Sequence, residues 1–192
     1  MTLDARWLDW DYWKSTGATP HYFGLGFIQL KVEADRRLHF WVPHWPSIPG
    51  STTELHDHRY DFTSTVLQGA VEQDVFGIGE LRSSPEEGSM ELVEVDCKPG
   101  REGAPVVKGY VRPLHLVRHR VDTGQSYRLG HEAFHCAQSV GDTITLLERG
   151  PVVKDLARVL RPVGTPFTCP FSLQVSEQDC WDQMKKMVDR PA

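Results

Sequence analysis

The sequence lacks the features that mark nucleic-acid-binding and membrane proteins. Its 192 residues include 26 acidic and 21 basic side chains, a net charge of −5 with neutral histidines. Such a chain has no broad basic surface for phosphate backbones, so nucleic acid is not the expected partner, although a local basic groove remains compatible with this charge. No run of 18 apolar residues is present, so no membrane span is expected. Residues 1–6 lack the basic and then apolar profile of a signal peptide, which predicts a cytoplasmic protein.

Cysteine is also scarce and scattered. The four residues Cys97, Cys136, Cys169 and Cys180 form no C-x-x-C pair, so neither a zinc knuckle nor a redox dithiol is indicated. In a reducing compartment they are expected to be free thiols. Nine histidines, by contrast, are many for this length, and their grouping carries the functional interpretation.

Short segments rich in β-branched and aromatic residues, separated by turn residues, fill the middle of the chain. They predict an all-β sandwich or barrel with a helix at each end rather than a βαβ fold. We expect a single domain over residues 1–192, with a helical segment at 1–20, a β-barrel at 21–160 and a helix at 176–190. The expected extended segments are 22–31, 37–42, 55–76 with a turn at 68–69, 90–95, 110–121, 126–129, 134–139 and 143–147.

The two end segments have the pattern of amphipathic helices. Leu3, Trp7 and Trp10 recur at helical spacing within residues 3–14. Ser176 with Asp179 forms a capping arrangement that begins the second helix. Its expected buried stripe is Cys180, Trp181, Met184 and Met187. For the tryptophans at 7, 10, 13, 41 and 45, packing in the core or a dimer is favoured over a surface that stacks a ligand.

His56 and His58 form an H-x-H pair in a segment predicted to be a strand. Alternate side chains of a strand share a face, so the two imidazoles are expected to project together and could bind one ion. The alternative is a pair of solvent-facing histidines. A second run places Gly124 and a turn before His135, which begins another strand.

Together these two runs resemble the cupin superfamily. His56, His58 and Gly69 match the first cupin motif, and Gly124 and His135 match the second. The resemblance implies a jelly-roll barrel, or double-stranded β-helix, in which the three histidines hold one metal ion, and it suggests a homodimer by analogy. The segment from His56 to Phe62 with the later Thr-Leu-Leu-Glu-Arg-Gly-Pro is also similar to small bacterial and phage cupin-like proteins.

One departure from the cupin motif affects the expected ligand set. The motif's glutamate falls at Phe62 or Thr63, neither of which is a ligand, so the resemblance favours a three-histidine site like that of thiol dioxygenases. Asp61 is the nearest acid and would join the site only if a bulge turned it inward. His131, in the turn before the third histidine, is a further candidate ligand or acid–base group, with a surface position as the alternative.

Three further residues are candidates for positioning substrate or moving protons: Tyr60, His115 and His119. The two histidines share strand parity with Val117, so they are expected to line the barrel interior, against the alternative of a solvated strand face. Tyr60 is expected to bond a ligand histidine or a substrate group.

The favoured function is that of a mononuclear iron(II) oxygenase acting on a small molecule. Zinc, manganese or nickel in the same site would instead indicate an isomerase, lyase or hydrolase, because imidazole suits all of these metals. The third hypothesis is a non-catalytic cupin that binds a small ligand or serves as a structural component.

Overall fold

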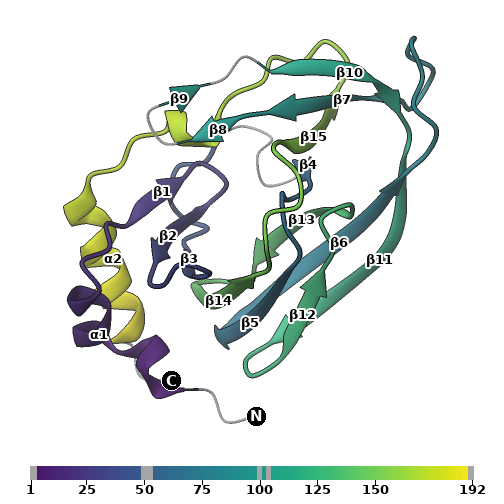
Figure 1. The fold of residues 1–192 in the computed structure, drawn as a ribbon. Helices are drawn as coiled ribbons and strands as arrows, with labels where there is room; N and C mark the ends of the chain where they lie inside the picture. The colour runs from purple at the N-terminus through teal and green to yellow at the C-terminus, as the bar shows by residue number, and fades with distance from the viewer. Residues whose placement is uncertain (1–3, 49–53, 99–100, 103–104, 190–192) are drawn as a thin grey trace.

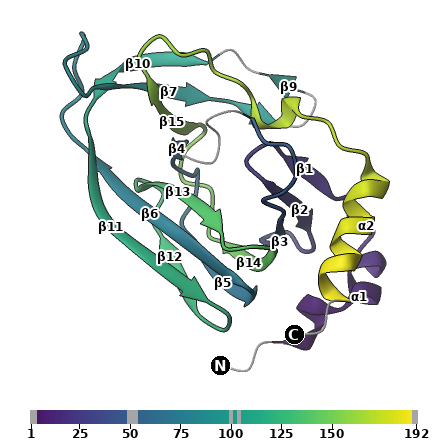
Figure 2. The same ribbon diagram turned by 180° about the vertical axis from the view of Figure 1, so that it is seen from behind.

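The computed structural model describes residues 4–48, 54–98, 101–102 and 105–189. Its strands form two antiparallel sheets that face each other in a jelly-roll sandwich, and two helices pack outside one of them (Figures 1 and 2). The predicted fold class, mainly β with a helix near each end, is therefore confirmed. Among the described residues, no helix is both long and apolar enough to cross a membrane.

The first sheet has six strands, in the order β1–β2–β3–β14–β5–β12. Their bounds are β1 His21–Phe23, β2 Phe27–Lys31, β3 Arg36–Trp41, β14 Thr143–Arg149, β5 Phe62–Gln68 and β12 Ser126–Leu129. The second sheet has seven, in the order β10–β7–β15–β4–β13–β6–β11. Their bounds are β10 Val106–Val111, β7 Met90–Val95, β15 Ala157–Pro162, β4 Leu55–His56, β13 Phe134–Ser139, β6 Ala70–Ile78 and β11 Pro113–Asp122. A small separate pair joins β8 Cys97–Lys98 to β9 Arg101–Glu102.

The first sheet separates the main apolar core from the interior of the sandwich. Its outward side chains, among them Ile28, Leu30, Leu38 and Phe40, pack against the terminal helices and are fully buried. The predicted stripe of the last helix, α2 Glu177–Val188, lies in this same core. A short 3-10 helix, Pro170–Ser172, precedes α2. Figures 1 and 2 show both terminal helices beside β1, β2 and β3.

The N-terminal helix predicted over residues 3–14 is interrupted. The chain forms a 3-10 helix at Ala5–Leu8 and then α1 at Trp10–Ser15, with an extended residue, Asp9, between them. The Asp9 carboxylate accepts a hydrogen bond from the backbone N–H of Tyr12 and so begins α1. A capping aspartate in the middle of an apolar helical pattern therefore divides one expected helix into two.

The turn between β5 and β6 carries the chain from one sheet to the other. Gly69 has a φ of +83°, and a Cβ at this position would meet the hydroxyl of Thr143 and the backbone of Asp142. Only glycine satisfies both the positive φ and this close approach. The predicted turn at 68–69 is thus confirmed.

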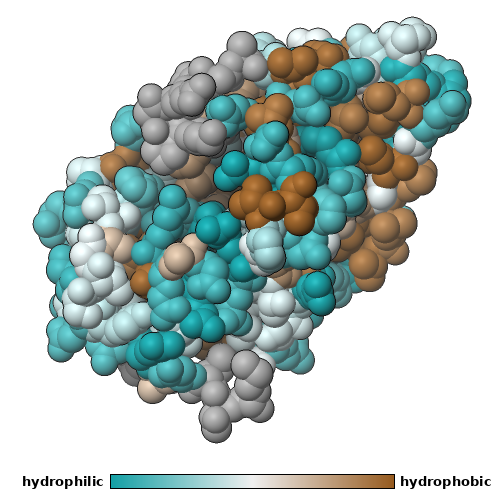
Figure 3. All heavy atoms as spheres, in the orientation of Figure 1, coloured by the Kyte–Doolittle hydropathy of each residue, from teal (hydrophilic) through white to brown (hydrophobic). Residues whose placement is uncertain are grey.

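Exposed apolar side chains gather at the end of the sandwich away from the helices, over β10 and β11 (Figure 3). Examples are Val106, Leu114 and Leu116, of which Leu116 is 64% exposed. The side of the molecule over the helices is mainly polar in the same view.

Candidate metal centre

His56, His58 and His135 come together on the inner side of the second sheet. His56 ends β4 and is paired in register with His135 of β13, while His58 lies two residues beyond the end of β4. The ring centroids are 4.7–5.1 Å apart, and one potential ligand atom from each residue lies within 4.8 Å of the others. The structure thus joins residues that are 77 positions apart in the chain.

The ring nitrogens have the separation that a shared ion requires. The Nε2 atoms of His58 and His135 are 2.8 Å apart, and two nitrogens bound at about 2.1 Å and at a right angle would lie about 3 Å apart. The backbone carbonyl of Glu54 accepts a hydrogen bond from Nδ1 of His56, which leaves the lone pair of its Nε2 available. Burial lowers the pKa of all three imidazoles, so they stay neutral, as metal ligands must be. This group could therefore hold a metal ion.

A buried ion pair fixes the segment that carries the first two histidines. Asp57 lies between them in the sequence, and its side chain is fully buried. Its carboxylate accepts hydrogen bonds from the backbone N–H and Nε of Arg158, at 2.7 and 2.5 Å, and from Nζ of Lys154, at 2.5 Å. Together with the bond from the Asp57 backbone N–H to the Arg158 carbonyl at 2.9 Å, these contacts anchor the chain between the two histidines.

A cavity opens between the two sheets beside the histidines. It consists of two adjoining hollows, of about 50 and 260 Å³, that share His39, Glu54, His56 and His58 among their lining residues. Apolar side chains form much of the wall, chiefly Leu25, Phe27, Trp41, Phe62 and Leu147. Such an enclosure, apolar with a few convergent polar groups, is typical of small-molecule sites.

The opposite wall comes from strands β2 and β3, which contribute three cross-strand pairs to the cavity. In register these are an aromatic pair, Phe27 and Trp41, a polar pair, Gln29 and His39, and a cationic pair, Lys31 and Arg37. We call them the aromatic, polar and cationic rungs. Trp41 packs in a buried apolar cluster with Phe27 and Val66, as expected, and it also lines the cavity and donates from Nε1 to the Thr145 hydroxyl.

Two titratable groups of the cavity wall were not singled out from the sequence. Nε2 of His39 accepts a hydrogen bond from the Gln29 amide nitrogen at 3.2 Å, and burial lowers the pKa of His39 to about 3. The carboxyl group of Glu54 lines both hollows, and burial raises its pKa to about 7. The sequence does show that each polar residue lies between two apolar neighbours, Gln29 between Ile28 and Leu30 and His39 between Leu38 and Phe40.

Tyr60, expected from the sequence to position substrate or move protons, lies in the cavity wall. Its ring centroid is 5.8 Å from that of His58, and its buried hydroxyl accepts a hydrogen bond from Nη1 of Arg37 at 3.1 Å. The Tyr60 hydroxyl is thus held by the Arg37 guanidinium rather than by one of the three candidate ligand histidines.

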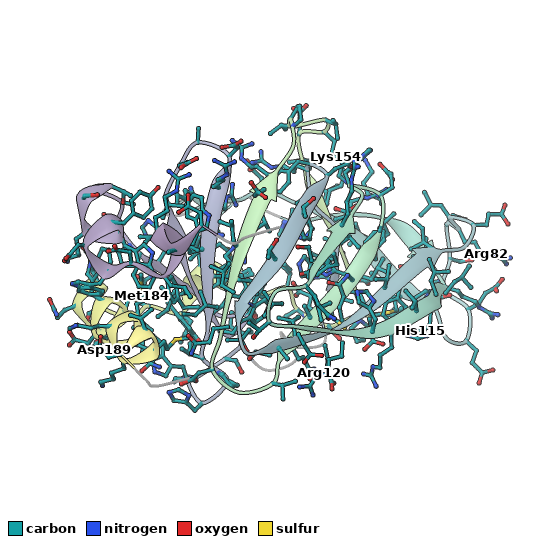
Figure 4. All side chains as sticks on the ribbon, turned by 90° about the horizontal axis from the view of Figure 1, so that it is seen from below. Arg82, His115, Arg120, Lys154, Met184 and Asp189 are labelled. Carbon is teal, nitrogen blue, oxygen red and sulfur yellow. The ribbon has the colours of Figure 1, made fainter. Side chains whose placement is uncertain are left out.

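His115 and His119 are not among the residues that line this cavity. The His115 side chain is 50% exposed and pairs with Asp74 at 2.8 Å, and in Figure 4 it lies on the same margin of the molecule as Arg120. His119 is half-buried and packs edge-on against Tyr127. The register of β11 shifts between His115 and Val117, which ends the strict alternation on which the interior position of His115 rested. His119 follows the shift and keeps the alternation with the buried Val121, and the ring that it contacts, Tyr127, lines the smaller hollow.

Asp61 and His131 pair with each other and lie outside the group of three histidines. The Asp61 carboxylate accepts from the backbone N–H of His131 at 2.9 Å and from its Nδ1 at 2.6 Å. These bonds lower the pKa of Asp61. Neither residue belongs to the group of potential ligands formed by the three histidines. The cysteines at 136, 169 and 180 are free thiols, as predicted.

No family model matches the sequence, and no curated protein matches it. Drosophila melanogaster CENP-C bound to CAL1 is similar in structure, at 9% identity over 76% of this chain and 91% of that chain, with a TM-score of 0.43. The hydroxypropylphosphonic acid epoxidase of S. wedmorenis is 9% identical over 69% of this chain and 55% of that chain, with a TM-score of 0.37. A hydroquinone 1,2-dioxygenase from a Sphingomonas species, with 4-hydroxybenzoate bound, is 10% identical over 62% of this chain and 63% of that chain, with a TM-score of 0.32. At these TM-scores the likeness assigns neither a family nor an activity to this chain.

Proposed function

We propose that the protein is a mononuclear metalloenzyme in which His56, His58 and His135 hold one divalent ion, with iron(II) as the first choice, and that it acts as an oxygenase on a small molecule. The proposal is carried by one observation. Three neutral imidazoles, from β4, from the segment that follows it and from β13, converge beside a cavity with room for a ligand. The cytoplasmic location and the homodimer expected from the sequence stay predictions.

Three neutral ligands leave the charge of the ion uncompensated and coordination positions open. Bound there, iron(II) would supply a redox-active Lewis acid for reactions with dioxygen. The protein's own contribution is to orient and enclose the substrate. The aromatic rung excludes water from one side, while the Tyr60 hydroxyl and the His39–Gln29 pair offer hydrogen bonds at fixed positions.

Metal content tests the site. The full chain, purified without chelator, is expected to contain about one equivalent of a divalent transition metal by elemental analysis. The His56→Ala and His135→Ala variants should contain almost none, because each removes one of three ligands. His21→Ala is the matched control, since His21 is an exposed residue of β1 and should leave the metal content unchanged. Equal metal in all four proteins would contradict the site.

Oxygen uptake tests the activity. After anaerobic loading with iron(II), the protein is expected to consume dioxygen in the presence of at least one small thiol, phenol or diketone, and the His135→Ala variant should not. Stoichiometric zinc, manganese or nickel without oxygen uptake would favour the isomerase, lyase or hydrolase alternative. Absence of bound metal, with no rise in thermal stability on adding metals, would favour a non-catalytic ligand-binding protein.

A further inference from the structure

The mouth of the larger hollow carries an accumulation of positive charge. Lys31, Arg37 and Arg59 line it, and Arg149 lies beside them, with its guanidinium 5.6 Å from the Tyr60 ring. Arg37 approaches the same ring at 5.5 Å, so two guanidinium groups lie near this tyrosine. Three of these four cations therefore line one hollow, which the acidic residues Glu54 and Asp57 also line.

None of these cations has a carboxylate partner among the described residues. The guanidinium of Arg37 donates to the Tyr60 hydroxyl, that of Arg59 to the Asp155 carbonyl at 3.4 Å, and that of Arg149 to the Ala34 carbonyl at 2.9 Å. By contrast, Arg36, the neighbour of Arg37 on the other face of β3, pairs with both Glu33 and Glu148.

The unpaired cations affect one another. Partial burial lowers the pKa of Lys31 and of Arg37, and nearby arginines lower both further. Like charges held together without a counter-ion raise the free energy of the folded protein, and an anion that enters the group relieves this repulsion. A guanidinium with free N–H donors is also the side chain best suited to bind a carboxylate or phosphonate through two parallel hydrogen bonds.

The order of the three rungs along β2 and β3 shows how far the positive charge lies from the aromatic part of the cavity. The cationic and aromatic rungs lie four residues apart on each strand, with the polar rung between them. Four residues of strand span about 13 Å, so a molecule that contacts both outer rungs has an extended body as well as a charged end. His56 and His58 line the same hollow from the opposite sheet.

We propose that the cavity binds a small organic anion with a flat apolar body, whose carboxylate or phosphonate is held at the mouth by Arg37 and Lys31. The body lies along the polar rung toward Phe27 and Trp41, and its side faces the three histidines. This inference rests on the proposed function for the role of the histidines, and it adds the chemical class of the substrate.

The test measures binding of a matched acid and amide to the full chain in the presence of a chelator. The probes are 3-phenylpropionate, its neutral amide 3-phenylpropanamide, and 2-phenylethylphosphonate as a second anion. A chelator is essential because a carboxylate could otherwise bind a metal directly. Trp41 lies in the cavity wall, so tryptophan fluorescence reports binding, and calorimetry gives the affinity. We expect each anion to bind at least about 10-fold more tightly than the amide.

Two variants and one control locate the source of this preference. Arg37→Gln should bring the acid-to-amide ratio close to one, and Lys31→Met, at an exposed side chain that folding does not need, should lower it several-fold. Arg120→Gln removes one charge from β11, on the other sheet, and should keep the ratio. Equal binding of acid and amide, absence of binding by both anions, or an unchanged ratio in Arg37→Gln overturns the inference. A clear ratio in a protein that fails the metal test refutes the proposed function alone.

Discussion

Replacing Asp57 by asparagine should destabilise the protein and weaken the metal site together. The carboxylate is fully buried, and the side chains of Lys154 and Arg158 that pair with it are only 20% exposed. Figure 4 labels Lys154. Asparagine keeps the shape and can still accept one hydrogen bond, but it leaves Lys154 without an anion and Arg158 with only the exposed carboxylate of Glu132. Breaking a buried pair in this way costs about 3–5 kcal/mol.

The expected shift in melting temperature follows from the size of the chain. For a domain of 150–250 residues, each kcal/mol corresponds to about 2–4 °C, so Asp57→Asn should melt at least about 6 °C lower than the wild type in calorimetry. Metal affinity should fall about 10–100-fold, the usual effect of losing a group that orients metal ligands. The reason is that these bonds anchor the chain between the two histidines, whose rings must keep their positions to bind an ion.

Asp74→Asn is the matched control for this change. Asp74 also pairs with two basic side chains, but those of His115 and Arg118 are 50% and 68% exposed. Exposed pairs contribute about 0–1 kcal/mol, so this variant should melt close to the wild type and bind metal normally. If Asp57→Asn behaved like Asp74→Asn in both assays, the buried pair would not be what orients the histidine segment, and the reasoning would be refuted.

Three further predictions concern the core, pH and a turn. Phe40→Ala should lower the free energy of unfolding by about 3–5 kcal/mol in urea titrations, because Phe40 is fully buried against Trp13; a loss below 1 kcal/mol would contradict this. His39 stays neutral in the folded state down to about pH 3, whereas an unfolded histidine takes up a proton below about pH 6.5. The free energy of unfolding should therefore fall as pH drops through this window, and less steeply in His39→Gln; equal slopes would refute the assignment. Gly69→Ala should destabilise more than Gly124→Ala by thermal melting, since both have positive φ but only the first Cβ meets neighbouring atoms.

Many strands could be predicted because each is a short run of β-branched and aromatic residues that ends at turn residues. Strands β7, β12 and β13 have the bounds expected from the sequence. The segment around the first two histidines was harder. One strand was expected from residue 55 to the turn at 68–69, but β4 ends at His56 and β5 begins at Phe62. The buried pairing of Asp57 with two residues about 100 positions later explains this break, and no local pattern announces it.

The candidate site was predictable only in part, for a physical reason. Two histidines one strand repeat apart form a local pattern, and the third was found through the resemblance to a second motif. The wall that faces them, with His39 and Arg37, depends on which side of β3 meets the other sheet, and a single sequence does not determine that. Glu54 escaped notice because a lone acid before a strand is usually exposed.

Strand β3 forms part of two interiors at once. Its odd-numbered residues Arg37, His39 and Trp41 line the cavity, while Leu38 and Phe40 pack against the helices on the other side. A deletion or insertion of one residue within this strand would exchange the two sets, placing a guanidinium among the helices and a phenyl ring beside the histidines. Ligand preference can therefore change during evolution through substitutions at alternate positions, whereas a change of strand length removes selectivity and stability in a single step.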